Sequence, residues 1–334
     1  MTLIIAEAGV NHNGSIDLAK TMIDEAVRSK VDIIKFQTYK SVDLVTKDAE
    51  KAEYQITHKQ SQETQFEMLK KLELDYSDFE KLKNYCDSKN IEFLSTAFDL
   101  DSLDFLFELG IKRIKISSAD INNIPYLRRV ASYKLPVILS TGMSNLDEVR
   151  QSLNILLRAG LEKEMVTILH CTTEYPAPLE SVNLLAMKTI GNDLDINVGY
   201  SDHTRYFEIP IAAVAMGATT IEKHFTISRN FEGPDHSASL EPEELTSMVQ
   251  SIRNIEIARG TGEKVPTKKE LSNLMAARRS IVAKREIAIG EILDEENISL
   301  KRPADGLSPM MWDEIIGKKA TKSYKKNELI KNES

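Results

Sequence analysis

The sequence predicts a (β/α)8 barrel followed by a small domain of short strands and turns. Eight short β-branched or apolar runs alternate with amphipathic stretches, which is typical of βαβ units around a parallel sheet. The eight units fit into roughly 260 residues, close to the typical size of such a barrel. After a polar segment at 260–269 the pattern changes to short strands and turns, which indicates a second domain.

The eight apolar runs are the expected barrel strands. In chain order they are LIIAEAG from Leu3, DIIKFQT from Asp32, IEFLSTA from Ile91, RIKISS from Arg113, PVILST from Pro136, VTILHC from Val166, INVGYS from Ile196 and TTIEKHFT from Thr219. Helical patterns lie between them. In SIDLAKTMIDEAVRS the apolar residues recur at three- and four-residue spacing, and Ser15 is placed to cap the first turn. The alternation favours a closed barrel over a doubly wound sheet.

Two segments break the alternation. Between Tyr39 and Gln62 lies a polar stretch containing KDAEKAEYQITHKQSQE, which is too long for an ordinary connection and is predicted to be an active-site loop. The segment GTGEKVPTKK, from Gly260 to Lys269, has the composition of a linker. We therefore expect a barrel domain at 1–262, a linker at 263–278 and a second domain at 279–334.

Composition limits the class of protein. The 334 residues are 42% hydrophobic, enough for a large core. A net charge of -8 argues against general nucleic-acid binding but leaves room for a local basic pocket. Cys86 and Cys171 are expected to be buried thiols, because two cysteines are too few for a disulfide framework. With no long apolar run and no leader pattern, we expect a cytoplasmic protein without a membrane partner.

Polar side chains gather where each predicted strand ends. Barrel enzymes place their chemistry at the C-terminal ends of the strands, so these residues predict a functional mouth. They are, by strand, Glu7; Lys35 and Gln37; Ser95 and Thr96; Lys115, Ser118 and Asp120; Ser140 and Thr141; His170 and Thr172; Ser201, Asp202 and His203; and Glu222 and His224.

His203 and His224 end adjacent strands, so their imidazoles are expected to converge on one ion. Two histidines with water and substrate oxygens suit Mn2+, Zn2+, Co2+ or Mg2+ in an open site that acts as a Lewis acid. The alternative is that each ring only hydrogen-bonds to its neighbours. Two histidines at adjacent strand ends favour the metal.

Lysines and hydroxyls form a second set, which comprises Lys35, Lys115, Ser118, Ser140 and Ser201. Two cations with several hydroxyls are suited to hold a phosphate or a carboxylate. The chain has no GxGxxG and no Walker loop, so nucleotide binding has no support. A lysine on a strand can instead form a Schiff base, as in aldolases, or be a solvated charge, and these alternatives stay open.

The order and content of the motifs point to a known family. The runs AEAGVNHNGS, KFQTYK, LSTAFD, LSTGM, LHCTTEYPAP, GYSDHT, EKHFT and GPDHSASLEP, followed by SIVAK, KRPADG and GKKA, resemble those of the bacterial sialic acid synthases. These are phosphoenolpyruvate-dependent nonulosonic acid synthases, and the likeness covers essentially the whole chain. It implies that the second domain is a mostly β antifreeze-like (SAF, β-clip) domain.

The resemblance implies an activity. We expect an N-acetylneuraminate synthase, a transferase that condenses phosphoenolpyruvate with N-acetylmannosamine, giving N-acetylneuraminate and phosphate. The alternative is N,N'-diacetyllegionaminate synthase, which uses 2,4-diacetamido-2,4,6-trideoxymannose. Less favoured are a pseudaminate synthase, a Schiff-base aldolase and a barrel that binds sugar without catalysis.

The resemblance also implies roles for individual residues. It assigns the metal, Mn2+ with Mg2+ or Co2+ as alternatives, to His203 and His224, and catalytic carboxylates to Glu7 and Asp120. It assigns phosphoenolpyruvate to Lys35, Thr96, Lys115, Ser118, Ser140 and Ser201, and the sugar to Gln37, Tyr175, Asp235 and Arg302. Arg302 is expected to reach the partner's barrel, which implies a domain-swapped homodimer.

Three positions depart from the family pattern. Asp120 ends SSAD where the family has PSGE or GSGE, Ala97 replaces the proline of STPF, and Thr173 stands where some members have asparagine. These differences bear on the range of sugars more than on the class of reaction.

Overall fold

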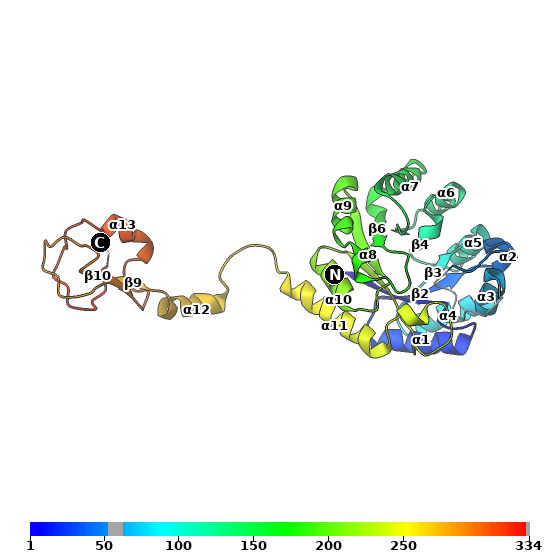
Figure 1. Cartoon of the computed structure of the whole chain (residues 1–334), viewed down its shortest axis with the longest axis horizontal. Coiled ribbons are helices and arrows are strands. Elements are labelled where there is room, and N and C mark those ends of the chain that lie inside the picture. The colour runs from blue at the N-terminus through cyan, green and yellow to red at the C-terminus, as the bar shows by residue number, and fades with distance from the viewer. Residues whose placement is uncertain (53–62, 332–334) are drawn as a thin grey trace. The chain divides into compact units, whose positions relative to one another are not determined.

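The computed structural model describes residues 1–52 and 63–331, which form two compact units, Met1–Gly260 and Thr261–Ser334. Figure 1 shows the strands and helices of each unit. Residues 53–62, which belong to the predicted active-site loop, lie outside the described residues. No helix in the described ranges is long and apolar enough to cross a membrane.

The first unit is a closed parallel barrel of eight strands in chain order, which confirms the predicted fold. The strands are β1 (Leu3–Gly9), β2 (Ile33–Thr38), β3 (Glu92–Ala97), β4 (Ile114–Ile116), β5 (Val137–Ser140), β6 (Val166–Cys171), β7 (Asn197–Asp202) and β8 (Thr220–His224). β8 pairs with β1, from Leu3 opposite Thr220 to Glu7 opposite His224, and this pairing closes the barrel.

Helices surround the strands and bury their apolar faces against them (Figure 1). They are α1 (Ile16–Arg28), α4 (Tyr76–Ser88), α5 (Leu100–Glu108), α6 (Ile124–Ser132), α7 (Leu146–Arg158), α9 (Leu185–Leu194), α10 (Glu208–Ala215) and α11 (Pro242–Ala258). Shorter elements are α2 (Ser41–Leu44), α3 (Gln65–Leu72), α8 (Leu179–Val182), η2 (Ser118–Asp120), η3 (Lys163–Met165) and η4 (His236–Ala238). Ser15 caps α1 by accepting a hydrogen bond from Leu18 N–H, as its position predicts.

The interior of the barrel is built in layers. One layer is an apolar cluster of five buried side chains, Ile5, Ile33, Leu94, Ile138 and Leu169. Because side chains alternate across a strand, the residue two positions further along each strand points into the barrel one layer higher. Those residues are Glu7, Lys35, Thr96, Ser140 and Cys171, and all five line the cavity described below. The apolar layer is therefore the floor of a polar site.

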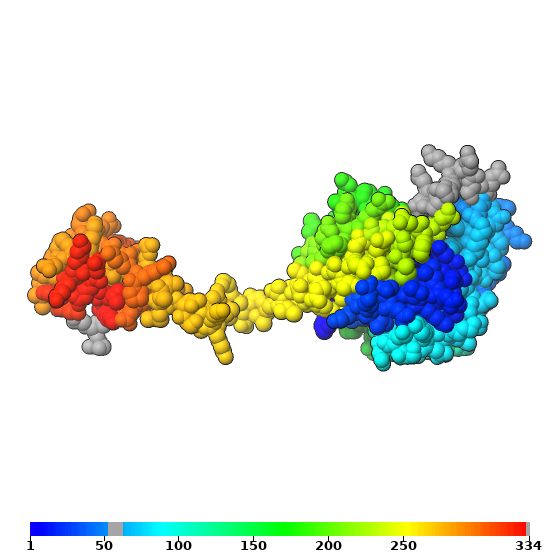
Figure 2. Space-filling model, turned by 90° about the horizontal axis from the view of Figure 1, so that it is seen from below, coloured from blue at the N-terminus to red at the C-terminus, as the bar shows by residue number. Residues whose placement is uncertain are grey.

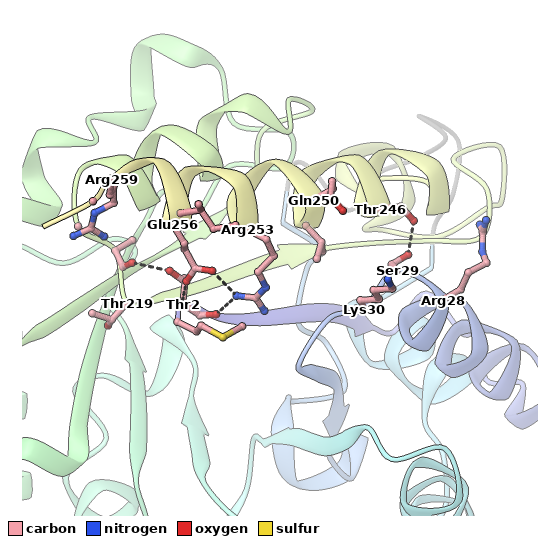
Figure 3. A pocket seen from close by; sticks show the side chains of 16 residues that line it. Thr2, Arg28, Ser29, Lys30, Thr219, Thr246, Gln250, Arg253, Glu256 and Arg259 are labelled. Carbon is pink, nitrogen blue, oxygen red and sulfur yellow. Dashed lines mark hydrogen bonds and ion pairs between the residues drawn. The ribbon is translucent and has the colours of Figure 1, made fainter. Parts of the chain in front are cut away.

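The other end of the barrel is tied to α11. Arg253 on α11 donates to Thr2 O at 2.8 Å, and Glu256 accepts from Thr2 N–H (Figure 3). Arg253 also donates to Asp32 Oδ2 at 2.8 Å. Figure 2 shows α1, in blue, beside the yellow segment that contains α11. A cavity of about 870 Å3 lies here, but Arg253 and Glu256 in its lining already pair with each other. Its position at the N-terminal ends of the strands argues against a catalytic role.

The second unit contains few regular elements. They are α12 (Lys268–Ala277), β9 (Ser280–Ala283), β10 (Ile298–Lys301), η5 (Pro309–Met311) and α13 (Trp312–Ile315), with β9 and β10 antiparallel. Isolated bridges such as Ile287 to Tyr324 extend the β structure around a small apolar core. The segment expected to be a linker contains α12, capped by Thr267, and none of the residues of α12 is buried.

Candidate active site

A cavity of about 400 Å3 opens at the C-terminal ends of the strands, and every strand of the barrel contributes to it. The structure brings nearly all of the predicted site residues to its walls. They are Glu7, Lys35, Gln37, Thr96, Lys115, Ser118, Ser140, Tyr175, Ser201, His203, His224 and Asp235. Two residues with an assigned role, Asp120 and Arg302, are not among them. Of the other strand-end residues expected at the mouth, Ser95, Thr141, His170, Thr172 and Asp202 do not line the cavity, whereas Glu222 does.

Two lysines lie at the base of the cavity on either side of Glu222. Lys35 Nζ is 2.8 Å from Glu7 Oε2 and 3.5 Å from Glu222 Oε2, and Lys115 Nζ is 3.7 Å from Glu222 Oε1. All four of these side chains are buried. The base therefore holds two ammonium groups and two carboxyl groups that share little water, so small changes in protonation have large electrostatic effects.

The pKa values of the two carboxyl groups, Glu7 and Glu222, shift in opposite directions. Burial raises the pKa of Glu7, and the attraction of Lys35 reverses only part of that shift while Glu222 adds to it. Burial alone would also raise the pKa of Glu222, but Lys115 and Lys35 together hold that pKa below its ordinary value. Glu222 is thus the permanent counter-ion, and Glu7 is the carboxyl group able to gain or lose a proton near neutral pH.

The pKa values of the two lysines also shift in opposite directions. Burial lowers the pKa of Lys115, and Glu222 offsets only part of this shift. For Lys35 the opposing effect of burial is outweighed by Glu222 and Glu7, so its pKa is raised. An incoming anion would stabilise both ammonium groups, which makes the pair suited to binding a phosphate or a carboxylate.

Hydroxyl groups complete the base. Lys35 donates to Thr96 Oγ1 at 3.1 Å, Lys115 to Ser140 Oγ at 2.6 Å, and Ser201 to Glu222 Oε1 at 2.9 Å. Further up, Ser118 Oγ accepts from Gly142 N–H at 2.9 Å. A side chain at Gly142 would begin 2.1 Å from Thr173 Oγ1, so only glycine allows this approach.

His203 and His224 converge as their strand positions predict, with ring centroids 5.4 Å apart. His203 Nδ1 lies 2.6 Å from Thr172 O, an acceptor that fixes the proton on Nδ1 and leaves Nε2 as a ligand atom. Nδ1 of His224 is buried without a hydrogen-bond partner and is 3.9 Å from Asp235 Oδ2. Burial lowers the pKa of His203 to about 4 and lowers that of His224 still more clearly, so both rings are neutral.

The two histidines fit a divalent cation in an open site. Neutral imidazoles with unshared nitrogen atoms are good ligands for Mn2+ and similar ions. No group of three or more histidine, cysteine or acidic side chains in the described ranges is arranged to hold a metal ion. An ion here would therefore need water or substrate oxygens to complete its coordination, which is the arrangement that catalysis requires.

Polar groups of the side wall surround Gly9. A methyl group added there would lie 3.3 Å from Gln37 Nε2, 3.3 Å from Glu7 Oε1 and 3.5 Å from Asp235 Oδ2. Gln37 donates to Glu7 Oε1 at 3.1 Å, and the Tyr175 ring is 4.1 Å from that of His203. Amide, carboxyl and phenol groups around one space are suited to a polyhydroxylated ligand.

Ionisation of the buried Asp235 side chain is expected to destabilise the folded protein. Burial raises its pKa from 3.8 to about 6. Because the folded protein holds this proton to a higher pH than the unfolded chain, the free energy of unfolding falls as pH rises between those two values. The ionised side chain is therefore expected to cost the metal-free protein up to about 3 kcal/mol at pH 8.

Asp235→Asn should remove this cost. We expect the metal-free variant to be more stable than the parent by about 1–3 kcal/mol at pH 8, with the gain disappearing near pH 3.8. Urea unfolding at several pH values measures the difference. Equal stability at pH 8 would contradict the assigned pKa.

The structure does not bring two predicted residues to the cavity. Asp120 lies in η2, where its carboxyl group accepts from Ser117 Oγ at 2.7 Å and Asn123 Nδ2 at 3.2 Å, and Ala119 lines the cavity instead. Arg302 belongs to the second unit and is exposed there. A catalytic role for either residue stays a prediction.

Two features of the site have no role assigned to them from the sequence. Glu222 is expected at the mouth, and its position two residues before His224 on β8 places both side chains on the barrel's inner face, but it has no assigned role. The second feature is an apolar wall on one side of the cavity. Its members are Val10, Tyr39, Leu44, Met68, Leu69, Leu72 and Phe98. Its only signal in the sequence is the helical spacing of apolar residues before Leu72.

Comparison with known proteins gives the family. The model of the NeuB family matches residues 22–264, and that of the SAF domain matches 278–334. The chain is 50% identical over 99% of both chains to the N,N'-diacetyllegionaminic acid synthase of Campylobacter jejuni. It is 47% identical, over 94% of this chain and 89% of the relative, to the enzyme of the same name from Legionella pneumophila.

A solved structure supports the same assignment. The N-acetylneuraminic acid (sialic acid) synthetase of Leptospira borgpetersenii superimposes with a TM-score of 0.72 at 36% identity, over 81% of this chain and 90% of that one. The family models and the relatives thus agree over both units of the molecule, and the solved structure agrees over 81% of the chain. The chain belongs to the NeuB family and carries a C-terminal SAF domain.

Proposed function

We propose that this protein is an N,N'-diacetyllegionaminic acid synthase, the alternative to the expected N-acetylneuraminate synthase. It would join phosphoenolpyruvate to 2,4-diacetamido-2,4,6-trideoxymannose and release phosphate. The observation that carries the proposal is the identity of 50% and 47% to two relatives of that name, over nearly their full lengths. The relative named for N-acetylneuraminate-9-phosphate is 34% identical.

The apolar wall supports this choice of sugar. The two acceptors differ at C6, which is a methyl group in the trideoxy sugar and a hydroxymethyl group in N-acetylmannosamine. Val10 follows Gly9, so the wall begins beside Gln37 and Asp235 and continues through Met68 and Leu72 of α3. With the aldehyde end of the acceptor toward the histidines, its C6 end would extend along this wall, where a methyl group would be favoured over a hydroxyl group.

The base of the cavity would hold phosphoenolpyruvate. Lys35 and Lys115, with hydroxyls from Thr96, Ser140 and Ser201, would bind the phosphate and carboxylate groups. His203 and His224 would hold Mn2+, which supplies Lewis-acid polarisation of the sugar's aldehyde oxygen. Gln37, Asp235 and Tyr175 would orient the acceptor's hydroxyl and amide groups above.

The reaction forms a carbon–carbon bond and a bond from water oxygen to C2, and it breaks the C2–O bond to phosphate. C3 of phosphoenolpyruvate bonds to the aldehyde carbon, whose oxygen takes up a proton and becomes a hydroxyl group. Water adds at C2 and loses a proton, and the hydroxyl group left on C2 loses its proton as phosphate departs, which gives the 2-keto acid. Glu7 would take the proton that the water loses, because its raised pKa lets it exchange protons near neutral pH. Glu222, whose pKa is held below its ordinary value, would supply negative charge to both lysines.

The test is phosphate release from phosphoenolpyruvate with Mn2+, measured with each candidate sugar in turn. We expect the highest kcat/KM with 2,4-diacetamido-2,4,6-trideoxymannose and product of the mass of the diacetylated nine-carbon acid. A higher kcat/KM for N-acetylmannosamine would restore the neuraminate assignment. Sugar binding without phosphate release would instead indicate a non-catalytic barrel.

The role of the apolar wall can be tested apart from the C4 substituent. The sugars 2-acetamido-2,6-dideoxymannose and N-acetylmannosamine differ only in the 6-hydroxyl group, and we expect a preference of about 10- to 100-fold for the former. Val10→Thr should reduce that preference severalfold, because it introduces a hydroxyl group of similar size. Val42→Thr, the same change at a residue that is 66% exposed, is the control. An unaltered ratio in Val10→Thr would exclude contact between the wall and C6.

Arg302 is proposed to complete the partner's site in a domain-swapped homodimer, with its guanidinium group on the sugar's N-acyl oxygen. Arg302→Ala and His203→Ala chains, each inactive alone, should regain activity when unfolded and refolded together. Half of the random dimers would be mixed and have one of two sites intact, so roughly a quarter of parental activity is expected. No gain, once mixed dimers are detected by mass, would mean that Arg302 acts within its own chain or not at all.

A further inference from the structure

A fully buried ion pair lies directly behind the two candidate metal ligands. Lys223 and Asp202 each have 0% exposed side-chain surface, and Lys223 Nζ lies 2.5 Å from Asp202 Oδ2. The two residues are opposite each other on the adjacent strands β8 and β7. Each stands beside a histidine in the sequence, Asp202 before His203 and Lys223 before His224.

The pair faces away from the cavity. Glu222 and His224 line the cavity on one side of β8, so Lys223 between them points toward the surrounding helices. The same alternation applies to Asp202, which lies between the lining residues Ser201 and His203. The pair therefore acts on any ligand only through the backbone that it holds.

The backbone it holds is the turn after His203. Lys223 Nζ donates to Thr204 O, while Asp202 accepts from Thr204 N–H at 3.2 Å and from Thr204 Oγ1 at 3.0 Å. Thr204 Oγ1 in turn accepts from Tyr206 N–H at 3.2 Å. Lys223 of β8 thus holds both Asp202, at the end of β7, and Thr204, in the turn that follows. These two residues flank His203 in the sequence.

Stability alone is a weak explanation for such a pair. Removing two charges from water costs several kcal/mol for each ion, and neutral replacements of buried pairs are often equally stable. In some proteins a buried polar or ionic group instead fixes the relative position of neighbouring elements. Here those two strands carry the convergent imidazoles.

We propose that Lys223 and Asp202 are positioning residues that set the distance and orientation between His203 and His224 for a shared metal ion. The inference rests on the proposed metal-dependent function. It assigns the pair a role similar to that of outer-shell partners of metal ligands, whose loss typically weakens metal affinity by about 10- to 100-fold.

The experiment measures Mn2+ binding to the full-length protein without substrates. The double variant Asp202→Asn with Lys223→Met removes both charges, keeps similar volumes and leaves an amide oxygen for Thr204. We expect its Kd for Mn2+, from calorimetry or from the EPR signal of free Mn2+, to rise about 10- to 100-fold. A saturating concentration of Mn2+ should then restore most of the turnover.

The matched control is another ion pair between adjacent strands. Arg113 Nε lies 2.6 Å from Glu92 Oε1. This pair is at the N-terminal ends of β3 and β4, whereas the cavity is at the C-terminal ends of the strands. Glu92→Gln with Arg113→Met should leave the Kd for Mn2+ unchanged even if the melting temperature falls. If the main double variant does not fold, Thr204→Val removes only the hydroxyl link, and its Kd should rise about fivefold.

The outcomes separate the inference from the proposed function. Parental protein that binds no Mn2+ would overturn both. A folded double variant with parental Kd, or with a lower melting temperature and nothing else, would overturn the positioning role while leaving metal dependence intact. A Kd increase equal to that of the Glu92 and Arg113 control would also overturn the positioning role.

Discussion

Replacing His203 or His224 with alanine is expected to lower turnover by at least about 10³-fold without unfolding the protein. As the proposed ligands of an open metal site, the two imidazoles would contribute more to chemistry than to the core. EDTA should abolish the activity of the parent protein, and added Mn2+ should restore it. Circular dichroism and a thermal melt show whether each variant stays folded.

His170→Ala is the control for this pair. His170 lies on β6, where its Nε2 is 2.8 Å from Val182 O, and it does not line the cavity. The His170 variant should retain turnover and sensitivity to EDTA. Full activity in thoroughly chelated parent protein would overturn the metal assignment.

Lys115→Met is expected to reduce kcat/KM for phosphoenolpyruvate by about 10²- to 10³-fold. The substitution keeps the length of the side chain but leaves an anionic group of the substrate buried without its cation, which typically costs about 3–5 kcal/mol. The free energy of unfolding should change little, because burial already disfavours the charged form of Lys115. Glu222 would also still have Lys35 and Ser201 as partners. Steady-state kinetics with varied phosphoenolpyruvate measures the effect.

The same lysine tests the aldolase alternative. Treatment of the parent with borohydride and pyruvate should leave Lys115 unmodified by mass spectrometry, since an anion-binding lysine forms no imine with pyruvate. Lys112→Met, at an exposed position near β4, is the control and should retain parental kinetics. A trapped adduct on Lys115 would mean Schiff-base chemistry.

The fold could be predicted because its strands are short and apolar on both faces. The run LIIAEAG is β1 and VTILHC is β6, residue for residue, and the remaining predicted runs overlap their strands with ends that differ by one or a few residues. Such runs stand out from amphipathic helices whatever the tertiary contacts. The predicted linker was different: α12 forms there, on local signals such as the capping box of Thr267 and Glu270.

The site could be predicted where it depends on strand position alone. Ser140 and His224 end their strands, Lys35 points inward from β2, and the barrel brings these side chains together. Contacts within loops carry no such signal. The sequence could not show that Asp120 hydrogen-bonds Ser117 and Asn123, or that α3 supplies part of the apolar wall. Both depend on how a connection folds back, which local patterns do not encode.

The filled floor of the barrel has a kinetic consequence. Ile138 and Leu169 are among the side chains that occupy the interior below Lys35 and Lys115, so a molecule bound to the lysines arrives and departs through the mouth. An acceptor held by Gln37 and Asp235, as proposed above, would stand in that path. Phosphoenolpyruvate would then have to enter first, and phosphate would have to wait for the nine-carbon product to leave. A site with a single opening would therefore impose an order of binding and release on the two substrates and the two products.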